Sequence, residues 1–513
     1  MTVTEFARAH APAGSAVDRA ASAPLPPGPD PRATVRWLRL LAEQEGPLDF
    51  LDRLGHRFGD VVMLRARLQN LVVVRGPEAV RRVLLAAQDN YRKSNQYELL
   101  APVLGEGLVT SSGELWKRQR RLVQPMFAKR HLGVFADHMA QAAGTALDAW
   151  ERQWPDGHPL ELAEEILHIG LDTVGRALVG HDFTDRASEF GAALGNALHQ
   201  VGAIGRAASV TATQYLPHMT IMRAAMLTQH RRYRSAMSSA EVLQAISAEI
   251  VDDRLRNGHG AANDLLRLLM EAADDETGER MDRRQVLDEL LTFTAAGHET
   301  TAHGLAWMYY LLSQHPAARE QMEAEVDAVL GGRVPTGEDA ERLPWTRACF
   351  EEAMRLYPPV WHVQRVPIQD DVVGGYRIPA GTLVFVSIWS THRDPGVWEN
   401  PAGFDPRRFM GDAPRQRPRF AYLPFSGGRR ICVGHGFAMM NATILAAMIA
   451  QRFRFDVIPG APIVLDPTVT IRPLHGIPVT IHRRRGAPPR VAGSQVSGDE
   501  RARGQITRYL AGS

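Results

Sequence analysis

A long stretch without proline constrains the fold of this chain more than any other feature. From about Asp282 to Gln314 there is no proline, and Pro316 supplies a stop. At about 1.5 Å per residue, one helix over this stretch is roughly 50 Å long, enough to cross the whole protein. Its middle, Thr294–Thr301, contains glycine and threonines, which lower helix stability. A weak segment at the centre of a spanning helix suggests a functional site.

The rest of the pattern predicts a large helical body with a small β-rich side. Residues 57–75 have the apolar segments and polar turn of a β-hairpin, and helical periodicity dominates from 116 to about 330. A second β-rich stretch covers about 360–388, and β-forming segments at 463–471 and 477–481 close the ordered part. A length of 513 residues alone favours two or more domains. The motifs below nevertheless belong to one large unit.

Composition excludes several classes of protein. Hydrophobic residues make up 45% and charged residues 23%, as in ordinary globular chains. The net charge of +2 gives no reason to expect nucleic acid as a partner. With only Cys349 and Cys432, a disulfide framework is excluded, and a reducing, cytoplasmic location is expected. No apolar run of about 18 to 20 residues occurs near the start, so we expect no integral membrane anchor.

Both ends of the chain differ in composition from the rest. Residues 1–35 are rich in alanine and proline, and Pro24–Pro29 forms a stiff lead-in of the polyproline type. Residues 485–513 form a polar tail rich in arginine and glycine, with little to bury. The folded domain is therefore expected over 36–484.

The strongest chemical signal is the segment Phe425–Gly434, which contains Cys432. A cysteine thiolate is a soft, anionic metal ligand, and the start of a following helix stabilises its charge. Gly428 and Gly434 allow the backbone to turn tightly and to approach a flat ligand closely. The alternative is a buried structural cysteine. The whole pattern has a chance probability on the order of one in ten thousand or less from average residue usage, which rejects that alternative.

This segment resembles the haem-binding loop of the cytochrome P450 family, F-x-x-G-x-R-x-C-x-G. Ala438 fits the extended form of that motif, and further landmarks follow in the family's order from about Gly28 to Arg483. The resemblance implies a mainly α prism with a small β region and a long central helix over the haem. It also implies haem b as the cofactor and Cys432 as the axial iron ligand. A thiolate supplies the electron density that favours O–O cleavage.

Three charged residues resemble the family's scaffold cluster. Glu352 and Arg355 form an E-x-x-R pair whose spacing brings both charges to one helix face. A solvated surface pair explains these two residues about equally well when they are taken alone. Residues 404–409 resemble a P-E-R-F segment, in which Arg407 replaces the usual glutamate. Arg408 stands where the clustered arginine belongs, and the role implied for all three is structural.

Four further residues are implied to bind the haem propionates. Arg430, in the cysteine loop, suits a carboxylate because a guanidinium binds carboxylates well. Trp116 and Arg120 resemble a W-x-x-x-R element and share one helix face. A basic helix face explains them equally well. Arg365 matches another propionate-binding arginine by its position after Arg355.

Residues 296–301 resemble the family's oxygen-activating segment, A-G-x-[DE]-T-[TS]. The acid Glu299 and the hydroxyl of Thr300 can organise water that delivers protons to oxygen. Ala296 is expected beside the haem, and Gly297 allows the helix to open locally. A zinc motif with His298 and His303 fails, because histidines five residues apart diverge by about 140° on a helix. These two are interpreted as ordinary core or surface histidines.

The resemblance also implies which positions face the substrate. They are residues 90–112, the long helix around Leu291 and Ala295, residues 360–363 and residues 473–476. Most are apolar, which suits a lipophilic substrate. Ordinary core packing explains any single one of them equally well.

The implied activity is a haem-thiolate monooxygenase. It would insert one oxygen atom from O2 into a fatty acid, terpenoid, sterol or polyketide-like molecule, by hydroxylation or epoxidation. No Rossmann glycine fingerprint and no flavin domain follow the haem domain, so a separate ferredoxin and ferredoxin reductase are expected as electron donors. A peroxide-driven hydroxylase and a non-catalytic haem sensor are the alternatives. The intact Glu299–Thr300 pair speaks against the first, and an apolar pocket would be unexplained in the second.

Overall fold

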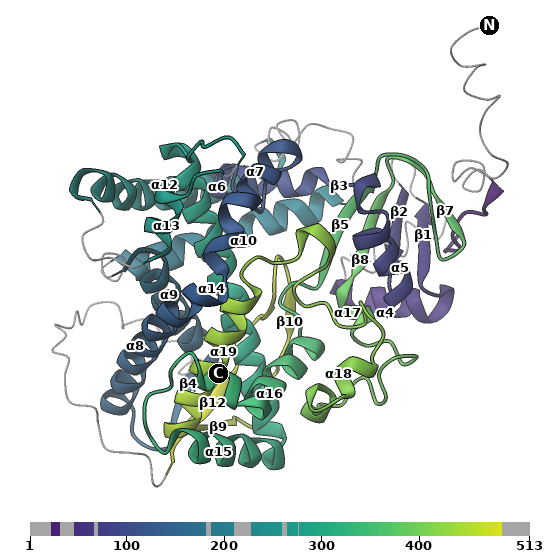
Figure 1. Cartoon of the computed structure of the whole chain (residues 1–513). Coiled ribbons are helices and arrows are strands. Elements are labelled where there is room, and N and C mark those ends of the chain that lie inside the picture. The colour runs from purple at the N-terminus through teal and green to yellow at the C-terminus, as the bar shows by residue number, and fades with distance from the viewer. Residues whose placement is uncertain are drawn as a thin grey trace, which may run out of the picture.

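A computed structural model describes most of the chain (Figure 1). The described residues are 22–30, 46–65, 70–180, 186–209, 227–258, 264–274 and 276–484. Most of the expected lead-in and all of the expected tail, 485–513, lie outside them. The described part of the lead-in is attached to the folded domain, because Met63 N–H donates to Pro27 O at 2.8 Å. Arg377 N–H donates in the same way to Pro24 O at 2.8 Å.

The long helix predicted from the absence of proline is confirmed as α14, Arg283–Gln314. Asp282 caps its start, accepting the N–H of Gln285 at 2.8 Å, and Pro316 begins the next helix. Buried side chains lie on all faces of its middle, as expected for a helix inside a protein. It runs through the body of the molecule (Figure 1) and packs on α9 (Leu162–Val179), α12 (His230–Asn257) and α16 (Pro344–Leu356).

The remaining helices form, together with α14, the larger part of the molecule (Figure 1). They are α4 (Gly46–Phe58), α5 (Pro77–Arg81), α6 (Ala101–Leu104), α7 (Gly113–Val123), α8 (Lys129–Gln153), α10 (Ala187–Ser209), α13 (Leu265–Glu271), α15 (Pro316–Leu330), α17 (Ile388–Thr391), α18 (Ala413–Gln416) and α19 (His435–Arg452). Helical periodicity therefore predicted most of this region correctly. None of the helices among the described residues combines the length and hydropathy needed to cross a bilayer.

The strands form one larger sheet and three small ones. The five-stranded sheet has the order β1 (Val61–Arg65), β2 (Asn70–Val74), β8 (Leu383–Ser387), β5 (His362–Pro367) and β3 (Tyr91–Lys93). The helices α4 and α5 lie beside this sheet (Figure 1). The three-stranded sheet has the order β4 (His158–Glu161), β12 (Pro478–Arg483) and β9 (Phe453–Val457). Two hairpins are β6 (Asp371–Val373) with β7 (Tyr376–Ile378), and β10 (Leu465–Pro467) with β11 (Ile471–Pro473).

The sheets confirm the predicted β-rich segments, but three strands, β3, β4 and β9, lie outside them. The hairpin expected within 57–75 is present, since β1 and β2 pair antiparallel with Val61 opposite Val74. β4 lies inside the region expected to be helical. Its pairing with β12, at the far end of the sequence, makes it a strand, and local periodicity does not contain that information.

One hydrophobic core runs through the helical body, from Leu48 to Ile481. A second cluster of buried residues lies against the five-stranded sheet. Most of the described helices contribute to the first core, whereas the buried side chains of α5 belong to the second.

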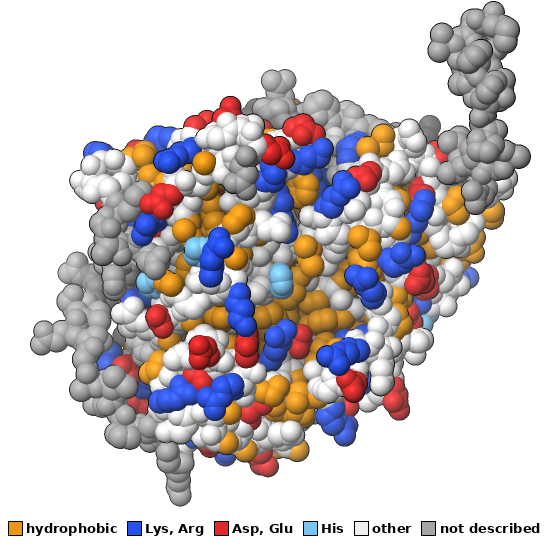
Figure 2. All heavy atoms as spheres, in the orientation of Figure 1, with side chains coloured by type: hydrophobic (Ala, Val, Ile, Leu, Met, Phe, Trp, Pro, Cys, Tyr) orange, Lys and Arg blue, Asp and Glu red, His pale blue; other side chains and the backbone are white. Residues whose placement is uncertain are grey.

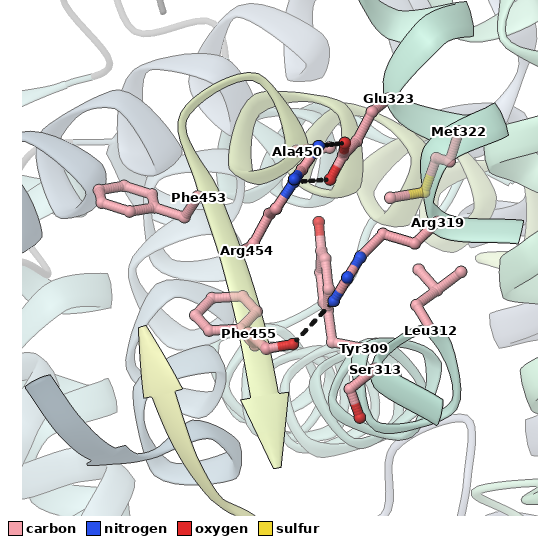
Figure 3. Close-up of a pocket in the computed structure, with 10 residues that line it drawn as sticks. All are labelled: Tyr309, Leu312, Ser313, Arg319, Met322, Glu323, Ala450, Phe453, Arg454 and Phe455. Atoms are coloured by element: carbon pink, nitrogen blue, oxygen red, sulfur yellow. Dashed lines mark hydrogen bonds and ion pairs between the residues drawn. The ribbon is translucent and has the colours of Figure 1, made fainter. Parts of the chain in front are cut away.

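A small crevice near the C-terminal end of α14 is structural in character (Figure 3). It has about 230 Å³ of empty volume. Arg454 forms an ion pair with Glu323 at its wall, and Arg319 donates to Phe455 O at 3.4 Å. Most of the polar groups drawn there are therefore already paired, although Arg319 Nε has no partner among the described residues. The crevice lies where α14, α15 and β9 pack together.

A buried charge cluster on α16 fastens the irregular part of the chain. Arg355 donates to both carboxylate oxygens of Glu352 at 2.7 Å, and neither side chain is exposed. The other N–H groups of Arg355 reach the carbonyl oxygens of His392, Pro401 and Gly403 at 2.7–3.0 Å. The spacing predicted the pair, and its burial excludes the surface interpretation.

Two further contacts extend this cluster towards the cysteine segment. Arg408 donates to Glu352 at 3.3 Å, as its position in the sequence predicts. The imidazole Nε2 of His392 accepts the N–H of Leu423 at 2.9 Å, just before Phe425. The position of the cysteine segment thus depends on α16 through a short series of hydrogen bonds.

We expect Glu352→Ala and Arg355→Ala each to lower the melting temperature strongly. Either change leaves the other charge buried without its partner, at a cost of about 3–5 kcal/mol. Arg415→Ala is the matched control, because Arg415 and its partner Asp412 are both largely exposed. Thermal unfolding followed by circular dichroism measures the effect. A melting temperature equal to that of the parent in the Glu352 and Arg355 variants would contradict a scaffold role.

Candidate active site

The segment around Cys432 is a tight loop that leads into α19. Cys432 N–H donates to Phe425 O at 3.0 Å, and Ile431 N–H donates to Gly428 O at 3.2 Å. Gly428 has φ +69°, and a Cβ there would lie 1.8 Å from Leu84 O, so only glycine fits. Gly434 has φ −85°, a conformation open to every residue. The loop geometry therefore explains Gly428, and it does not require glycine at 434.

The Cys432 thiol lies at the N-terminal end of α19. Gly434 is the N-cap of this helix, and Ala438 N–H donates to Gly434 O at 2.8 Å in the first turn. Cys432 is exposed by surface area, yet protein atoms surround it closely on most sides. This partial desolvation raises the pKa of the thiol, while the Gly434 N–H and the Arg120 guanidinium lower it. Both lowering groups are positioned to stabilise a thiolate.

Three cations lie together beside this loop. The pairing of β3 with β5 sets Lys93 opposite Arg365, and Arg430 is close enough to lower the pKa of Lys93. Burial, Arg430 and Arg365 together lower that pKa to about 6. Burial and Arg365 lower the pKa of Arg430 to about 10. Among the residues that the structure describes, none of the three has a carboxylate in a salt bridge.

The neighbours of these cations are mostly neutral acceptors. Lys93 donates to the carbonyl oxygens of Val109 at 2.5 Å and Ser111 at 3.2 Å. Glu289 also acts on Lys93, but burial raises the pKa of that carboxyl to about 8, so it is largely protonated at neutral pH. Arg365 and Arg430 therefore keep an excess of positive charge, which suits an anionic ligand. With a pKa of about 6, Lys93 is largely neutral at neutral pH, and an anion bound beside it would favour its protonation.

Trp116 and Arg120, which were expected to act together, contact different groups. The Arg430 guanidinium lies over the Trp116 ring, 4.1 Å from its centroid. Arg120 instead donates to Ile431 O at 2.8 Å, which joins α7 to the cysteine loop. The structure thus gathers Trp116 with the cation cluster and puts Arg120 next to Cys432.

The middle of α14 contains the acid and the hydroxyl predicted from the sequence. Thr300 Oγ donates to Ala296 O at 2.7 Å, one turn back, and both residues line a cavity. α14 is continuous here, so the expected local opening is not seen. The threonine affects the helix in another way. Its hydroxyl is a second donor to Ala296 O, a carbonyl oxygen of the helix backbone.

Glu299 faces the β10–β11 hairpin from α14. Its carboxylate lies 3.4 Å from Thr470 Oγ, and burial raises its pKa to about 7, while Arg472 opposes the shift. At neutral pH this carboxyl therefore exchanges a proton readily. His298 lies 3.0 Å from Leu167 O, whereas His303 lies 3.4 Å from Thr470. The two histidines diverge, as their spacing predicts.

The cavity beside α14 is large and mostly apolar. Its empty volume is about 1350 Å³, including open solvent at its mouth. The lining comes from the segment after β3, α10, α14, β5, β8 and the β10–β11 turn. The residues are Gln96, Tyr97, Leu99, Leu100, Leu104, Val109, Leu198, Val201, Gly202, Thr292, Ala295, Ala296, Thr300, Val360, Trp361, His362, Gln364, Phe385, Thr468, Val469 and Thr470. Such a wall suits a lipophilic molecule.

Two of the expected substrate-facing positions are wrong. Leu291 is buried in the core, and Thr292 lines the cavity instead, because residues 292, 295, 296 and 300 share one face of α14. Residues 473–476 do not line the cavity either, and Leu474 is 48% exposed. The turn of the β10–β11 hairpin, residues 468–470, occupies that wall.

These side chains fit a haem. Cys432 offers a soft sulfur ligand, and Lys93, Arg365 and Arg430 offer the positive charge that two propionates need. Ala296 and Thr300 expose a small apolar and hydroxyl surface on α14. Sequence reasoning missed Lys93. No local motif marks it, and only the β3–β5 register reveals its place opposite Arg365.

Comparisons with known proteins agree with this geometry. The cytochrome P450 family profile matches residues 26–475. The chain is 35% identical to cyclooctatin synthase of Streptomyces melanosporofaciens, over 84% of this chain and 91% of that one. It is 33% identical to cyclooctat-9-en-7-ol 5-monooxygenase of the same organism, over 81% and 86%.

A solved structure shows the same fold. The crystal structure of the cytochrome P450DA heme domain superposes with a TM-score of 0.79 at 26% identity, covering 90% of this chain and 98% of that one. Sequence, fold and site thus agree over nearly the whole described chain. The protein belongs to the cytochrome P450 family of haem-thiolate monooxygenases.

Proposed function

We propose that this protein inserts one oxygen atom from O2 into a lipophilic, terpenoid-like substrate, with electrons from a separate ferredoxin and ferredoxin reductase. The observation that carries the proposal is the apolar cavity whose wall includes Thr300, next to the acid Glu299. One relative is named as a monooxygenase of cyclooctat-9-en-7-ol and another as a cyclooctatin synthase, and the proposed terpenoid-like substrate class follows these names. We further propose a cytoplasmic location, consistent with two free cysteines.

The residues of the site divide the work. Haem b, when bound, supplies the iron at which O2 is reduced and cleaved. Cys432 would provide the sulfur ligand, and Lys93, Arg365 and Arg430 would hold the propionates. The cavity wall excludes water and holds the substrate near α14. Thr300 Oγ, released from Ala296 O, can hold a water, while Glu299 supplies the proton.

The surface near the cysteine loop fits a redox partner. Ile431, next to Cys432, is 40% exposed, and Arg429 and His435 beside it are exposed as well. Figure 2 shows hydrophobic side chains near the centre of one face, with Lys and Arg side chains and some Asp and Glu side chains around them. An acidic ferredoxin is the partner that such a surface favours.

Product formation under three conditions tests the function. Purified protein would receive a terpenoid library with NADPH, a surrogate ferredoxin and its reductase, then with peroxide alone, then with neither. We expect oxygenated product only with the complete electron-transfer system. Product with peroxide alone would indicate a peroxide-driven hydroxylase. No product in any condition, with normal haem and substrate binding, would favour a haem sensor.

Thr300→Ala should uncouple the reaction and leave haem content and substrate affinity nearly intact. Without the hydroxyl, the proton-delivering water is lost, and general acid assistance is typically worth about 10²–10⁴-fold. NADPH would still be consumed, and hydrogen peroxide would leave in place of product. The measurement is product and peroxide per NADPH. Thr301→Ala, at the adjacent buried hydroxyl, is the control and should stay coupled. Equal coupling in parent and Thr300→Ala would remove Thr300 from the mechanism.

Cys432→Ser should lose the absorption of the reduced carbon monoxide complex that marks thiolate ligation. An alcohol is a poor replacement for a thiolate on iron. Cys349→Ser is the matched control, since Cys349 is fully buried on α16 and burial raises its pKa well above the usual value. That variant should keep the spectrum of the parent. The same spectrum in Cys432→Ser would identify another residue as the ligand.

Lys93→Met should weaken haem retention by removing a buried cation from the propionate site. A charged hydrogen bond contributes about 1.5–3 kcal/mol, which corresponds to roughly ten- to hundredfold in affinity. Haem transfer to apomyoglobin, followed by absorbance, measures the loss. Lys117→Met, at an exposed position on α7, serves as the control. Equal transfer rates in both variants would exclude Lys93 from the propionate site.

A further inference from the structure

Two N–H groups at the cavity have no acceptor among the residues that the structure describes. They are the indole Nε1 of Trp361 and the imidazole Nδ1 of His362, and both side chains line the cavity. Both nitrogens are enclosed, so bulk water does not satisfy them. A buried donor without an acceptor is costly, and native proteins rarely keep one without a reason.

The hydrogen bonds around His362 determine where its proton lies. Ser94 Oγ donates to Gln364 Oε1 at 2.7 Å, which leaves the Gln364 amide nitrogen facing His362 Nε2 at 3.3 Å. That nitrogen can only donate, so His362 Nε2 accepts and Nδ1 carries the proton. Burial lowers the pKa of His362 to about 3, so the ring is neutral. His362 Nδ1 is therefore a neutral donor.

Aromatic packing holds both rings at the cavity wall. The His362 ring stacks on Phe385 with centroids 4.1 Å apart and planes 7° apart. Trp361 lies 4.1 Å from the His362 ring and 5.5 Å from Phe385, centroid to centroid. To bind a ligand, either ring would have to rotate so that its N–H faces the cavity. Thr292 Oγ also lacks a partner, but a hydroxyl can turn to a helix carbonyl and so requires no ligand.

We propose that Trp361 and His362 bind an acceptor oxygen of the substrate, so that the substrate class is a lipophilic alcohol or ketone. This inference rests on the proposed function and narrows its substrate. Two adjacent donors match the lone pairs of one hydroxyl or carbonyl oxygen. The apolar remainder of the wall takes the hydrocarbon skeleton.

The charges around the cavity favour a neutral oxygen over a carboxylate. None of the described residues that line the cavity is charged, and His362 is neutral. A carboxylate taken from water into this site would lack a counter-ion, which is far more costly than burying a hydroxyl. Arg365 neighbours Gln364 on β5, but it belongs to the cation cluster and does not line the cavity. Fatty acids are therefore poor candidates for this anchor.

Paired ligands that differ by one oxygen test the inference. The haem-loaded protein would be titrated with cedrol and cedrene, and with 1-dodecanol and dodecane, and the dissociation constants taken from the Soret shift. We expect each alcohol to bind about five- to tenfold more tightly than its hydrocarbon, the value of one or two neutral hydrogen bonds. If neither alcohol binds more tightly than its hydrocarbon, including the case of no binding, the proposal is wrong.

Two variants assign the preference to these side chains. Trp361→Phe and His362→Phe each remove one N–H and keep an aromatic ring. Each should reduce the alcohol preference several-fold and leave hydrocarbon affinity within about twofold. The melting temperature of ligand-free Trp361→Phe should not fall, because this change removes an unsatisfied donor. His362→Phe also removes the acceptor of the Gln364 amide N–H, so its melting temperature is not a criterion.

Trp345→Phe is the matched control outside the cavity. Its indole N–H already donates to Ala318 O at 3.0 Å, so this variant should keep the alcohol preference of the parent. An unchanged preference in both Trp361→Phe and His362→Phe would overturn the proposal, as would equal losses for alcohol and hydrocarbon. Turnover separates the two proposals. Alcohol preference without product would contradict the monooxygenase function only, and product without that preference would contradict this inference only.

Discussion

The buried ion pair between Glu352 and Arg355 is the interaction on which the active site depends. Segments without regular structure cannot satisfy their own carbonyl groups, and burying them unsatisfied would be costly. Arg355 has five N–H groups in one plane, and it uses them on Glu352 and on three main-chain carbonyls. His392 then holds Leu423, immediately before the cysteine loop. The position of the loop around Cys432 therefore depends on α16, through the hydrogen bonds of Arg355 and His392.

Buried charges are compensated differently in the Glu352–Arg355 cluster and in the cation cluster beside the cysteine loop. In the scaffold, the buried arginine is paired with a carboxylate, which offsets the cost of desolvation. Beside the cysteine loop, Lys93, Arg365 and Arg430 gather with carbonyl oxygens as their acceptors. Burial first, and then repulsion from Arg430 and Arg365, lower the pKa of Lys93. An anionic ligand relieves this repulsion, so haem binding and local stability are coupled.

α14 connects the two sides of the cavity. One face carries Ala296 and Thr300 towards the cavity, and Glu299 leaves the same helix towards the β10–β11 hairpin. The hairpin also lines the cavity through residues 468–470. The acid thus has a protein partner, Thr470, that is itself at the cavity wall. The β10–β11 turn therefore both shapes the cavity and contacts the proposed proton donor, Glu299.

The sequence by itself determined the elements whose cause is local. Absence of proline, the Asp282 cap and Pro316 set the length of α14, and the positive φ of Gly428 follows from a turn that a motif can encode. Only the tertiary structure revealed which segments that are distant in the sequence lie against one another. The β3–β5 register brought Lys93 to Arg365, the β10–β11 turn displaced residues 473–476 from the cavity, and packing on Phe385 fixed His362. Local sequence records backbone preferences within a few residues, whereas these contacts depend on which distant surfaces the core brings together.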